Sequence, residues 1–388
     1  MDFALTPNQE SIRDAVAKIC ARFDDAYWLK KDKEGGFPAD LHKALADAGW
    51  LGICIPEEYG GSGLGILDAA IMMRTISESG AGMSGASAVH MNVFGLNPVV
   101  VFGTKEQCRR MLPGIVDGRE KACFAVTEPN AGLDTTKLTT RAVRSGDVYV
   151  VHGQKIWIST AQVADRVLLL ARTTPLEEVA RPTLGLSLFY AALDKAHVEA
   201  RVIDKMGRKA VDSNQVFFDG LRVPVEDLIG AEGHGFEYLL HGLNPERILI
   251  AAEAVGIGRA ALQRAARYAK ERVVFGRPIG QNQGIQHPLA KCWINLQAAH
   301  LMMLRAASLY DSGEPCGIQA NAAKYLGGEA GFEACEAAVL AHGGMGYAKE
   351  FHVERLLREV MIARIAPVSR ELILCNIAEK ALGLPKSY

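Results

Sequence analysis

The sequence lacks several features that define common functional classes. Its 43 Lys and Arg residues are balanced by 44 Asp and Glu residues, which leaves a net charge of −1. A general nucleic-acid-binding protein carries a basic footprint, so nucleic acid is not an expected partner. No run of about 18 residues is free of charges and turn-forming residues, and we therefore expect no membrane span.

Targeting segments, disulfide frameworks and metal motifs are equally scarce. The N-terminal sequence MDFALTPNQE has no basic stretch followed by an apolar one, so no secretory signal is expected. We expect a cytoplasmic protein, or a protein of the mitochondrial matrix if a transit peptide was removed. The eight cysteines form no C-x-x-C pair and no His/Cys cluster at zinc spacing. An even number of cysteines in a secreted chain can mean disulfides, but here we expect reduced, mostly buried thiols and no metal site.

Hydrophobic periodicity divides the chain into three parts. Helical stripes and two capping signatures, at residues 6–9 and 104–107, predict an N-terminal helical domain over residues 1–120. Dense β-branched and aromatic runs without intervening helices predict a central antiparallel β domain, a sandwich or barrel, over residues 121–232. The helical period then returns and predicts a C-terminal helical bundle over residues 233–388. Its long helices are expected at about residues 236–272, 288–311, 317–341 and 352–382. The expected fold class is therefore α+β with three domains.

Glycine-rich stretches do not meet the context of a nucleotide-binding fingerprint. Gly256 and Gly258 lie inside a helical pattern, and residues 342–346 follow a helix, whereas the fingerprint needs a strand before it and a helix after it. Taken alone, these glycines indicate helix packing and turn geometry. No P-loop and no G-x-S-x-G elbow is present, so neither nucleotide nor Ser/His/Asp hydrolase chemistry is indicated.

Two predicted strand ends carry the most informative side chains. Residues 124–134 end a strand in a turn that exposes Thr127 and several backbone N–H groups. Residues 153–159 present the indole of Trp157 and the hydroxyl of Ser159 at the end of another strand. An aromatic face with convergent donors suits a flat heteroaromatic ligand. A core tryptophan next to a turn serine is the structural alternative.

Together with other motifs in the same order, these two segments resemble the acyl-CoA dehydrogenase family over essentially the whole chain. The matching segments are residues 56–61, 126–129, 157–159, 205–207, 222–224, 272–276 and 342–347. The resemblance implies an α–β–α subunit with non-covalent FAD that converts a saturated acyl-CoA to a trans-2-enoyl-CoA. It also implies an electron-transfer flavoprotein as electron acceptor and a homo-oligomer, usually a tetramer.

The resemblance assigns site residues one by one. Cofactor contacts would come from Phe124, Val126, Thr127, Leu133, Trp157, Ile158, Ser159, Arg272, Phe275, Gln283, Gly343, Gly344 and Ser369. Of these, Arg272, Phe275, Gln283 and the loop of Gly343 and Gly344 would reach the FAD of a neighbouring subunit. Substrate contacts would come from Leu133, Asn244 and Arg247, the last two at the CoA arm.

The expected catalytic base departs from the common family pattern. Many members carry a glutamate in a Y-E-G-T motif near the C-terminus, but this chain has Pro367 there, and proline cannot act as a base. The isovaleryl- and long-chain-type branches carry the glutamate on the long helix, immediately before an arginine. Glu246 precedes Arg247 at that place and is our expected catalytic residue; a surface glutamate paired with Arg247 is the structural alternative. Pro245 inside this helix would remove one backbone hydrogen bond and is expected to kink the helix.

Other departures leave rival functions open. Leu133 replaces a serine that is usual in the turn within residues 124–134, which we call the flavin turn. Leu340 replaces a glutamine that is usual before H-G-G. One rival is an enzyme of the same fold with other chemistry, desulfinase-like or monooxygenase-like. The other is a non-enzymatic FAD-containing scaffold. Bleaching of the flavin by an acyl-CoA without oxygen distinguishes a dehydrogenase from both.

Overall fold

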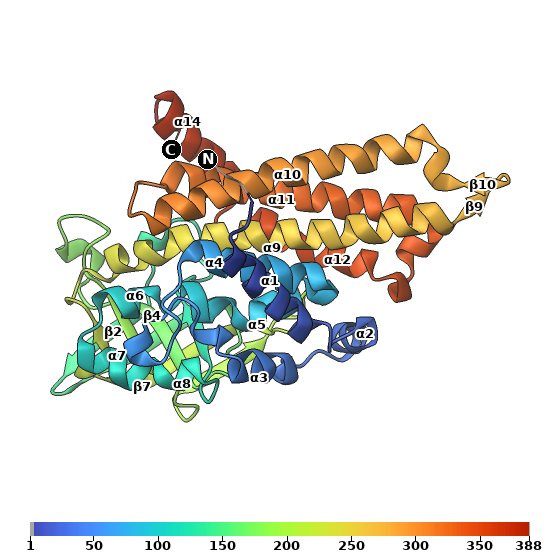
Figure 1. Cartoon of the computed structure of the whole chain (residues 1–388). Coiled ribbons are helices and arrows are strands. Elements are labelled where there is room, and N and C mark those ends of the chain that lie inside the picture. The colour runs from blue at the N-terminus through green and yellow to red at the C-terminus, as the bar shows by residue number, and fades with distance from the viewer. Residues whose placement is uncertain (1–3, 388) are drawn as a thin grey trace.

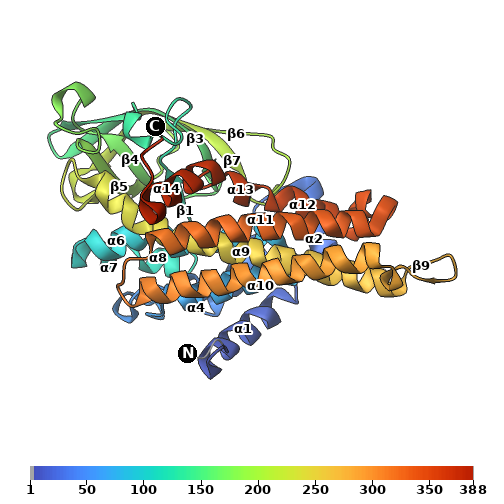
Figure 2. The same cartoon turned by 90° about the horizontal axis from the view of Figure 1, so that it is seen from above.

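Three long C-terminal helices form the axis of the molecule. In the computed structural model, which describes residues 4–387, they run side by side in both views of Figures 1 and 2. They are α9 (Gly235–Glu271), α10 (Gln283–Asp311) and α11 (Gly317–His342). The 37 residues of α9 span about 55 Å at 1.5 Å per residue. At one end of this axis, the short hairpin of β9 (Val273–Val274) and β10 (Arg277–Pro278) projects beyond the body of the protein (Figures 1 and 2).

Shorter helices from the N-terminal part of the chain pack against this axis. Both predicted capping boxes are confirmed: Thr6 accepts a hydrogen bond from the Gln9 backbone N–H, and Thr104 accepts one from that of Gln107. Helices α4 and α5 pack directly on α9, and almost every residue of α5 is buried. The helices are α1 (Pro7–Cys20), α2 (Asp25–Glu34), α3 (Ala39–Asp47), α4 (Ile66–Ile76), α5 (Gly82–Phe94), α6 (Asn97–Phe102), α7 (Lys105–Met111) and α8 (Pro113–Val116).

One apolar stretch in this region has the length of a membrane span. Residues 66–102 reach a mean hydropathy of 1.2 in their most apolar window, and 56% of that window is buried inside the protein. The stretch is broken at Gly80, whose φ of 101° interrupts the helix before α5 begins. Burial of this kind is expected for helices that form the core of a domain.

The central part of the chain forms one eight-stranded sheet. Its neighbours lie in the order β6-β7-β3-β2-β4-β5-β8, with β1 added beside β4. Most pairs are antiparallel, as the sequence predicts, whereas β1 runs parallel to β4. The strands are β1 (Ala122–Ala125), β2 (Arg141–Ser145), β3 (Val148–Ser159), β4 (Arg166–Arg172), β5 (Leu186–Ala192), β6 (Val198–Val202), β7 (Ser213–Pro224) and β8 (Leu228–Ile229).

The structure corrects two sequence-based expectations about helices. The segment expected as one helix over residues 352–382 is three: α12 (Val353–Val360), α13 (Ile362–Ile365) and α14 (Arg370–Leu382). The first break falls at Met361. The second falls at Pro367, which has no N–H to donate, and Ser369 then caps the new helix. The second difference is α2, a helix that the sequence analysis did not predict.

Two other expectations are confirmed. A Cβ on Gly256 would lie 2.5 Å from the backbone oxygen of Arg74, and one on Gly258 would lie 3.0 Å from Gly331, so these glycines allow close helix packing. All eight cysteines are unpaired, and six of them are buried.

Candidate active site

Glu246 lies on α9, one residue after the internal proline. Pro245 does not end the helix, which continues as one element to Glu271. The Glu246 side chain is half-buried, and no hydrogen bond or ion pair joins it to another residue in the described part of the chain. Arg247 does not pair with it, because its Nη1 donates to the Asn244 Oδ1 at 3.0 Å. The alternative of a surface salt bridge between Glu246 and Arg247 is therefore wrong.

Burial raises the pKa of Glu246 to about 7. The charges of His90, Arg247 and Lys324 act in the opposite direction, and that of Glu253 adds to the effect of burial. A carboxylate with a pKa near neutrality is suited to accept a proton at physiological pH. Removal of the Cα proton from an acyl-CoA requires a base with such a pKa.

The acidic residue nearest to Pro367 on its C-terminal side has the opposite character. Glu371 is exposed on α14, and its Oε1 lies 2.7 Å from the Arg370 Nε. The hydrogen bond from Arg370 lowers the pKa of Glu371. Of the two carboxylates, only Glu246 combines burial with the lack of a partner.

Lys324 of α11 connects the Pro367 loop to the surroundings of Glu246. Its Nζ, almost fully buried, donates to the Val368 carbonyl at 2.5 Å. Its charge lowers the pKa of Glu246, while burial lowers the pKa of Lys324 itself to about 8. The loop also holds Ser369, whose Oγ accepts a hydrogen bond from the Leu372 N–H at 3.2 Å.

A buried pair that the sequence analysis did not identify lies near the same carboxylate. The His90 Nδ1 on α5 lies 2.5 Å from the Glu253 Oε1 on α9, seven residues and about 10 Å of helix beyond Glu246. Burial disfavours the charged imidazole, but Glu253 outweighs this and raises the pKa of His90. The two residues are 163 positions apart in the sequence, so no local sequence pattern predicts that they pair.

Aromatic contacts link this pair to the strand that leads into the flavin turn. The His90 ring lies 4.7 Å from that of Phe94, which in turn lies 5.2 Å from that of Phe124 on β1. Phe124 therefore packs toward α5.

A buried ion pair fixes the turn after β1. The Lys155 Nζ donates to the Val126 carbonyl at 2.9 Å and to the Glu128 Oε1 at 3.0 Å. Backbone N–H groups of Thr139 and Thr140 donate to the same carboxylate at 2.7 and 2.9 Å. Burial alone would raise the pKa of Glu128, but Lys155 and these donors hold it at about 2. This network joins the β1 turn to β3.

The two predicted strand ends lie side by side at one end of the sheet, where β1 and β3 finish. We call this end of the strands the sheet edge. The Ile156 N–H donates to the Thr127 carbonyl at 2.9 Å, which places the end of β1 beside the end of β3. The pairing of β3 with β7 shifts register between Lys155 and Ile158, and Trp157 sits in this irregularity with a φ of 63°. Its indole consequently points outward and is 56% exposed. The alternative of a core tryptophan is therefore wrong.

The other residues predicted at this edge differ in accessibility. Val126 and Ile158 are buried, so the side chain of neither offers an exposed surface. Thr127 and Ser159 are half-buried, and Leu133 is exposed. A flat indole beside two accessible hydroxyls forms a neutral, partly aromatic donor set, and this set fits the isoalloxazine ring of FAD.

The remaining predicted cofactor residues lie at the far end of the long helices. Arg272 follows the last residue of α9, about 39 Å along the helix axis from Glu246. Phe275 lies between β9 and β10, at the tip of the projecting hairpin, and is fully exposed. Gln283 begins α10, and Gly343 and Gly344 open η8 (Gly343–Tyr347), where a Cβ on either glycine would meet nothing within 4 Å.

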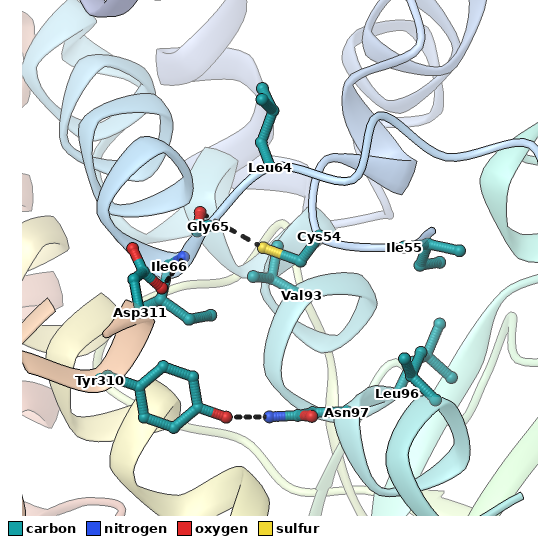
Figure 3. Close-up of a pocket in the computed structure, with 11 residues that line it drawn as sticks. Cys54, Ile55, Leu64, Gly65, Ile66, Val93, Leu96, Asn97, Tyr310 and Asp311 are labelled. Atoms are coloured by element: carbon teal, nitrogen blue, oxygen red, sulfur yellow. Dashed lines mark hydrogen bonds between the residues drawn. The ribbon is translucent and has the colours of Figure 1, made fainter. Parts of the chain in front are cut away.

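Two cavities accompany these sites. A cavity of about 580 Å³ opens beside Arg247, between α9, the start of α11 and α14. A smaller one of about 120 Å³ lies between α4, α5 and the end of α10 (Figure 3). In the smaller cavity, Asp311 accepts from the Ile66 and Leu67 N–H groups at the start of α4, and Asn97 donates to the Tyr310 hydroxyl at 2.6 Å. These contacts join helices, and no predicted site residue lies there.

Comparisons with known proteins agree with this geometry. Sequence profiles of the acyl-CoA dehydrogenase N-terminal, middle and C-terminal domains match residues 6–119, 123–221 and 233–382. The chain belongs to the acyl-CoA dehydrogenase family. FAD is accordingly its cofactor, and it is an oxidoreductase that acts on acyl-CoA.

Individual relatives cover nearly the full chain. The acyl-CoA dehydrogenase FadE12 of Mycobacterium bovis is 39% identical over 100% of this chain and 99% of its own length. The caffeyl-CoA reductase–Etf complex subunit CarC of Acetobacterium woodii is 33% identical over 86% of this chain and 87% of its own. The structure of butyryl-CoA dehydrogenase from Megasphaera elsdenii superposes with a TM-score of 0.93 at 29% identity, over 99% of this chain and 100% of that one.

Proposed function

We propose that the protein dehydrogenates a saturated acyl-CoA to the trans-2-enoyl-CoA with Glu246 as the catalytic base. The observation that carries this proposal is a half-buried glutamate with a pKa near 7 that has no hydrogen-bond or ion-pair partner within residues 4–387. Bound FAD supplies the acceptor for the hydride that leaves Cβ. The work of the chain's own residues is to remove the proton from Cα and to hold the thioester in place.

The proton step follows from the electrostatics around α9. The ionised Glu246 accepts the Cα proton, and burial makes the neutral product of this transfer favourable. Pro367 leaves the alternative position without any titratable group. Glu371 is exposed and paired with Arg370, so it has no comparable tendency to hold a proton.

The CoA arm is proposed to lie along the cavity beside Arg247. The guanidinium of Arg247 and the ammonium of Lys380 border this space and supply the positive charge that phosphate groups require. The hydrogen bond from Arg247 to Asn244 fixes the orientation of both side chains. Arg247 follows Glu246 directly, and Asn244 precedes it by two residues. Binding of the CoA arm is therefore coupled to the position of the proposed base.

FAD is proposed to be shared between subunits of a homotetramer. Thr127, Trp157 and Ser159 lie at the sheet edge, whereas Arg272 and Phe275 lie beyond the C-terminal end of α9, about 39 Å along the helix axis from Glu246 for Arg272. An exposed phenylalanine on a projecting hairpin is a surface of the kind that contacts another molecule. Two subunits in opposite orientation would bring the two sets together.

An electron-transfer flavoprotein is the proposed electron acceptor. The support is that one relative of 33% identity is a subunit of a complex with such a protein. The proposed compartment is the cytoplasm, and the unpaired cysteines are compatible with its reducing conditions.

The test is anaerobic flavin reduction by a panel of acyl-CoA thioesters. We expect at least one saturated acyl-CoA to bleach the flavin of the wild-type protein and to yield its 2-enoyl product. Flavin that stays oxidised with every thioester in the panel, in a protein that binds FAD stoichiometrically, would contradict the proposed activity. That outcome favours the scaffold or one of the other same-fold chemistries.

A further inference from the structure

Arg208 joins three separate elements beside the flavin turn. It lies between β6 and β7, in a left-handed conformation with a φ of 59° that few non-glycine residues adopt. Its Nη2 donates to the Ser159 Oγ at 2.9 Å and to the Ser213 Oγ at 3.1 Å. Its Nη1 donates to the Ser87 Oγ on α5 at 3.2 Å. The guanidinium thus spans the ends of β3 and β7 and the helix that carries His90.

This guanidinium has no acidic partner. Its three contacts are neutral hydroxyls, and no carboxylate of residues 4–387 lies within 4.0 Å of it. Burial lowers the pKa of Arg208, and the more distant charges of Glu253, Glu359 and Asp212 raise it only in part. Arginine nevertheless stays protonated in proteins. A cation without a matched anion is therefore held next to Ser159.

The contact also restricts the Ser159 hydroxyl. A hydroxyl has one proton to donate, and its oxygen accepts here from Arg208. Within the described residues, no acceptor takes the Ser159 proton. The hydroxyl is half-buried at the edge where Thr127 and Trp157 also lie, so its O–H is available to a cofactor bound at this edge.

We propose that Arg208 is a positioning residue for FAD, which orients Ser159 as a hydrogen-bond donor to the flavin and raises the flavin reduction potential. A hydride carries two electrons and one proton, so its arrival adds negative charge at the flavin edge. A fixed cation close to developing negative charge stabilises the charged state, most strongly where water is excluded. This inference rests on FAD binding at Ser159 as set out under the proposed function.

The experiment compares reduction potentials of the purified holoenzyme and its variants. Arg208→Gln removes the charge and keeps part of the hydrogen-bonding capacity. Arg208→Lys keeps the charge but not the planar fork. The matched control is Lys209→Gln, which removes the same charge from the next residue, an exposed one. Potentials are measured by equilibrium titration with a chemical reductant against a reference dye, without any acyl-CoA.

We expect Arg208→Gln to lower the equilibrium constant for flavin reduction at least tenfold, which is about 30 mV for a two-electron couple. Arg208→Lys should lower it by a smaller but measurable factor, because it keeps the charge and loses the fork that orients Ser159, and Lys209→Gln should match the wild type. Wild-type potential in Arg208→Gln with full FAD occupancy would overturn the proposal. Equal shifts in Arg208→Gln and Lys209→Gln would also overturn it, because the effect would then be one of net charge.

A second arm covers the case in which Arg208→Gln fails to retain FAD. Ser159→Ala, alone and combined with Arg208→Lys, then tests whether Arg208 acts through the hydroxyl. If it does, Arg208→Lys shifts the potential less in the Ser159→Ala background than in the wild type. Equal shifts in both backgrounds contradict the orientation of Ser159 by Arg208. Because no substrate is used, failure of the dehydrogenase proposal leaves this test intact.

Discussion

Glu246→Gln is predicted to change activity and stability in opposite directions. Glutamine keeps the size and much of the polarity of the side chain but cannot accept the Cα proton. Loss of a positioned general base typically lowers the rate by about 10²–10⁴-fold. FAD occupancy should stay unchanged, because no hydrogen bond or ion pair within residues 4–387 joins Glu246 to the flavin turn or to β3.

With Glu246 as the proposed base, its pKa of about 7 predicts the pH dependence of the wild-type reaction. Only the ionised carboxylate accepts a proton, and the ionised fraction rises from about 0.1 at pH 6 to about 0.9 at pH 8. The rate of flavin reduction by a saturating acyl-CoA should therefore rise about tenfold over this interval. In Glu246→Gln the residual rate should be flat over the same range.

The same pKa predicts a change in folding stability. The folded state holds the proton more tightly than the unfolded chain, whose glutamate titrates near 4.5. The stability is therefore fully present below pH 4.5 and decreases as the pH rises through about 7. A shift of two to three units corresponds to a loss of about 3 kcal/mol at pH 8. Glu246→Gln should recover up to this amount at pH 8 and gain nothing at pH 4.

The assays are stopped-flow anaerobic flavin bleaching and urea unfolding at fixed FAD concentration. Glu371→Gln is the matched control, because this exposed carboxylate pairs with Arg370 and should affect neither measurement. Wild-type bleaching by Glu246→Gln, together with a stalled Glu371→Gln, would show that the base lies on the C-terminal segment. A pH profile without a break between 6 and 8 would refute the role of burial in setting the pKa.

Further substitutions test the rest of the site. Lys155→Met leaves the buried Glu128 without its cation, so we expect a loss of about 3–5 kcal/mol of stability and weaker FAD binding; Lys137→Met, at an exposed position, should cause neither. Arg272→Ala should lower FAD occupancy and oligomer stability together, because a ligand that binds the assembled state stabilises it; light scattering that shows a monomeric, fully loaded wild type would contradict this. Gly256→Ala forces a Cβ to 2.5 Å from a neighbouring backbone oxygen and should cost about 1–3 kcal/mol in urea unfolding.

Sequence patterns predicted what depends on neighbours in the chain. The capping box at Thr6 involves residues three positions apart, and the partial exposure of Thr127 follows from a strand that ends in a turn. The break before Ser369 was also visible in principle, since Pro367 cannot continue a helix. The continuous apolar stripe on either side of it favoured a single helix and outweighed that signal.

Contacts between distant parts of the chain could not be predicted in this way. The charge state of Glu246 depends on His90 and Lys324, which lie on two other helices. Arg208 meets Ser87, 121 residues away, only because the loop between β6 and β7 lies against α5. Local periodicity shows that each of these elements exists, but it does not determine which side chains face one another.

Lys324 connects the loop of Pro367 to the proposed base on α9. Its ammonium binds the Val368 carbonyl, directly after Pro367, and its charge also acts on Glu246. The loop is therefore joined to this cation by a hydrogen bond, and Glu246 is joined to it by an electrostatic interaction. A carboxylate on a long helix packed along α11 is held more rigidly than one in a loop. The loop has a structural role here, because its Val368 carbonyl is the acceptor that holds the Lys324 ammonium, whose charge acts on the proposed base.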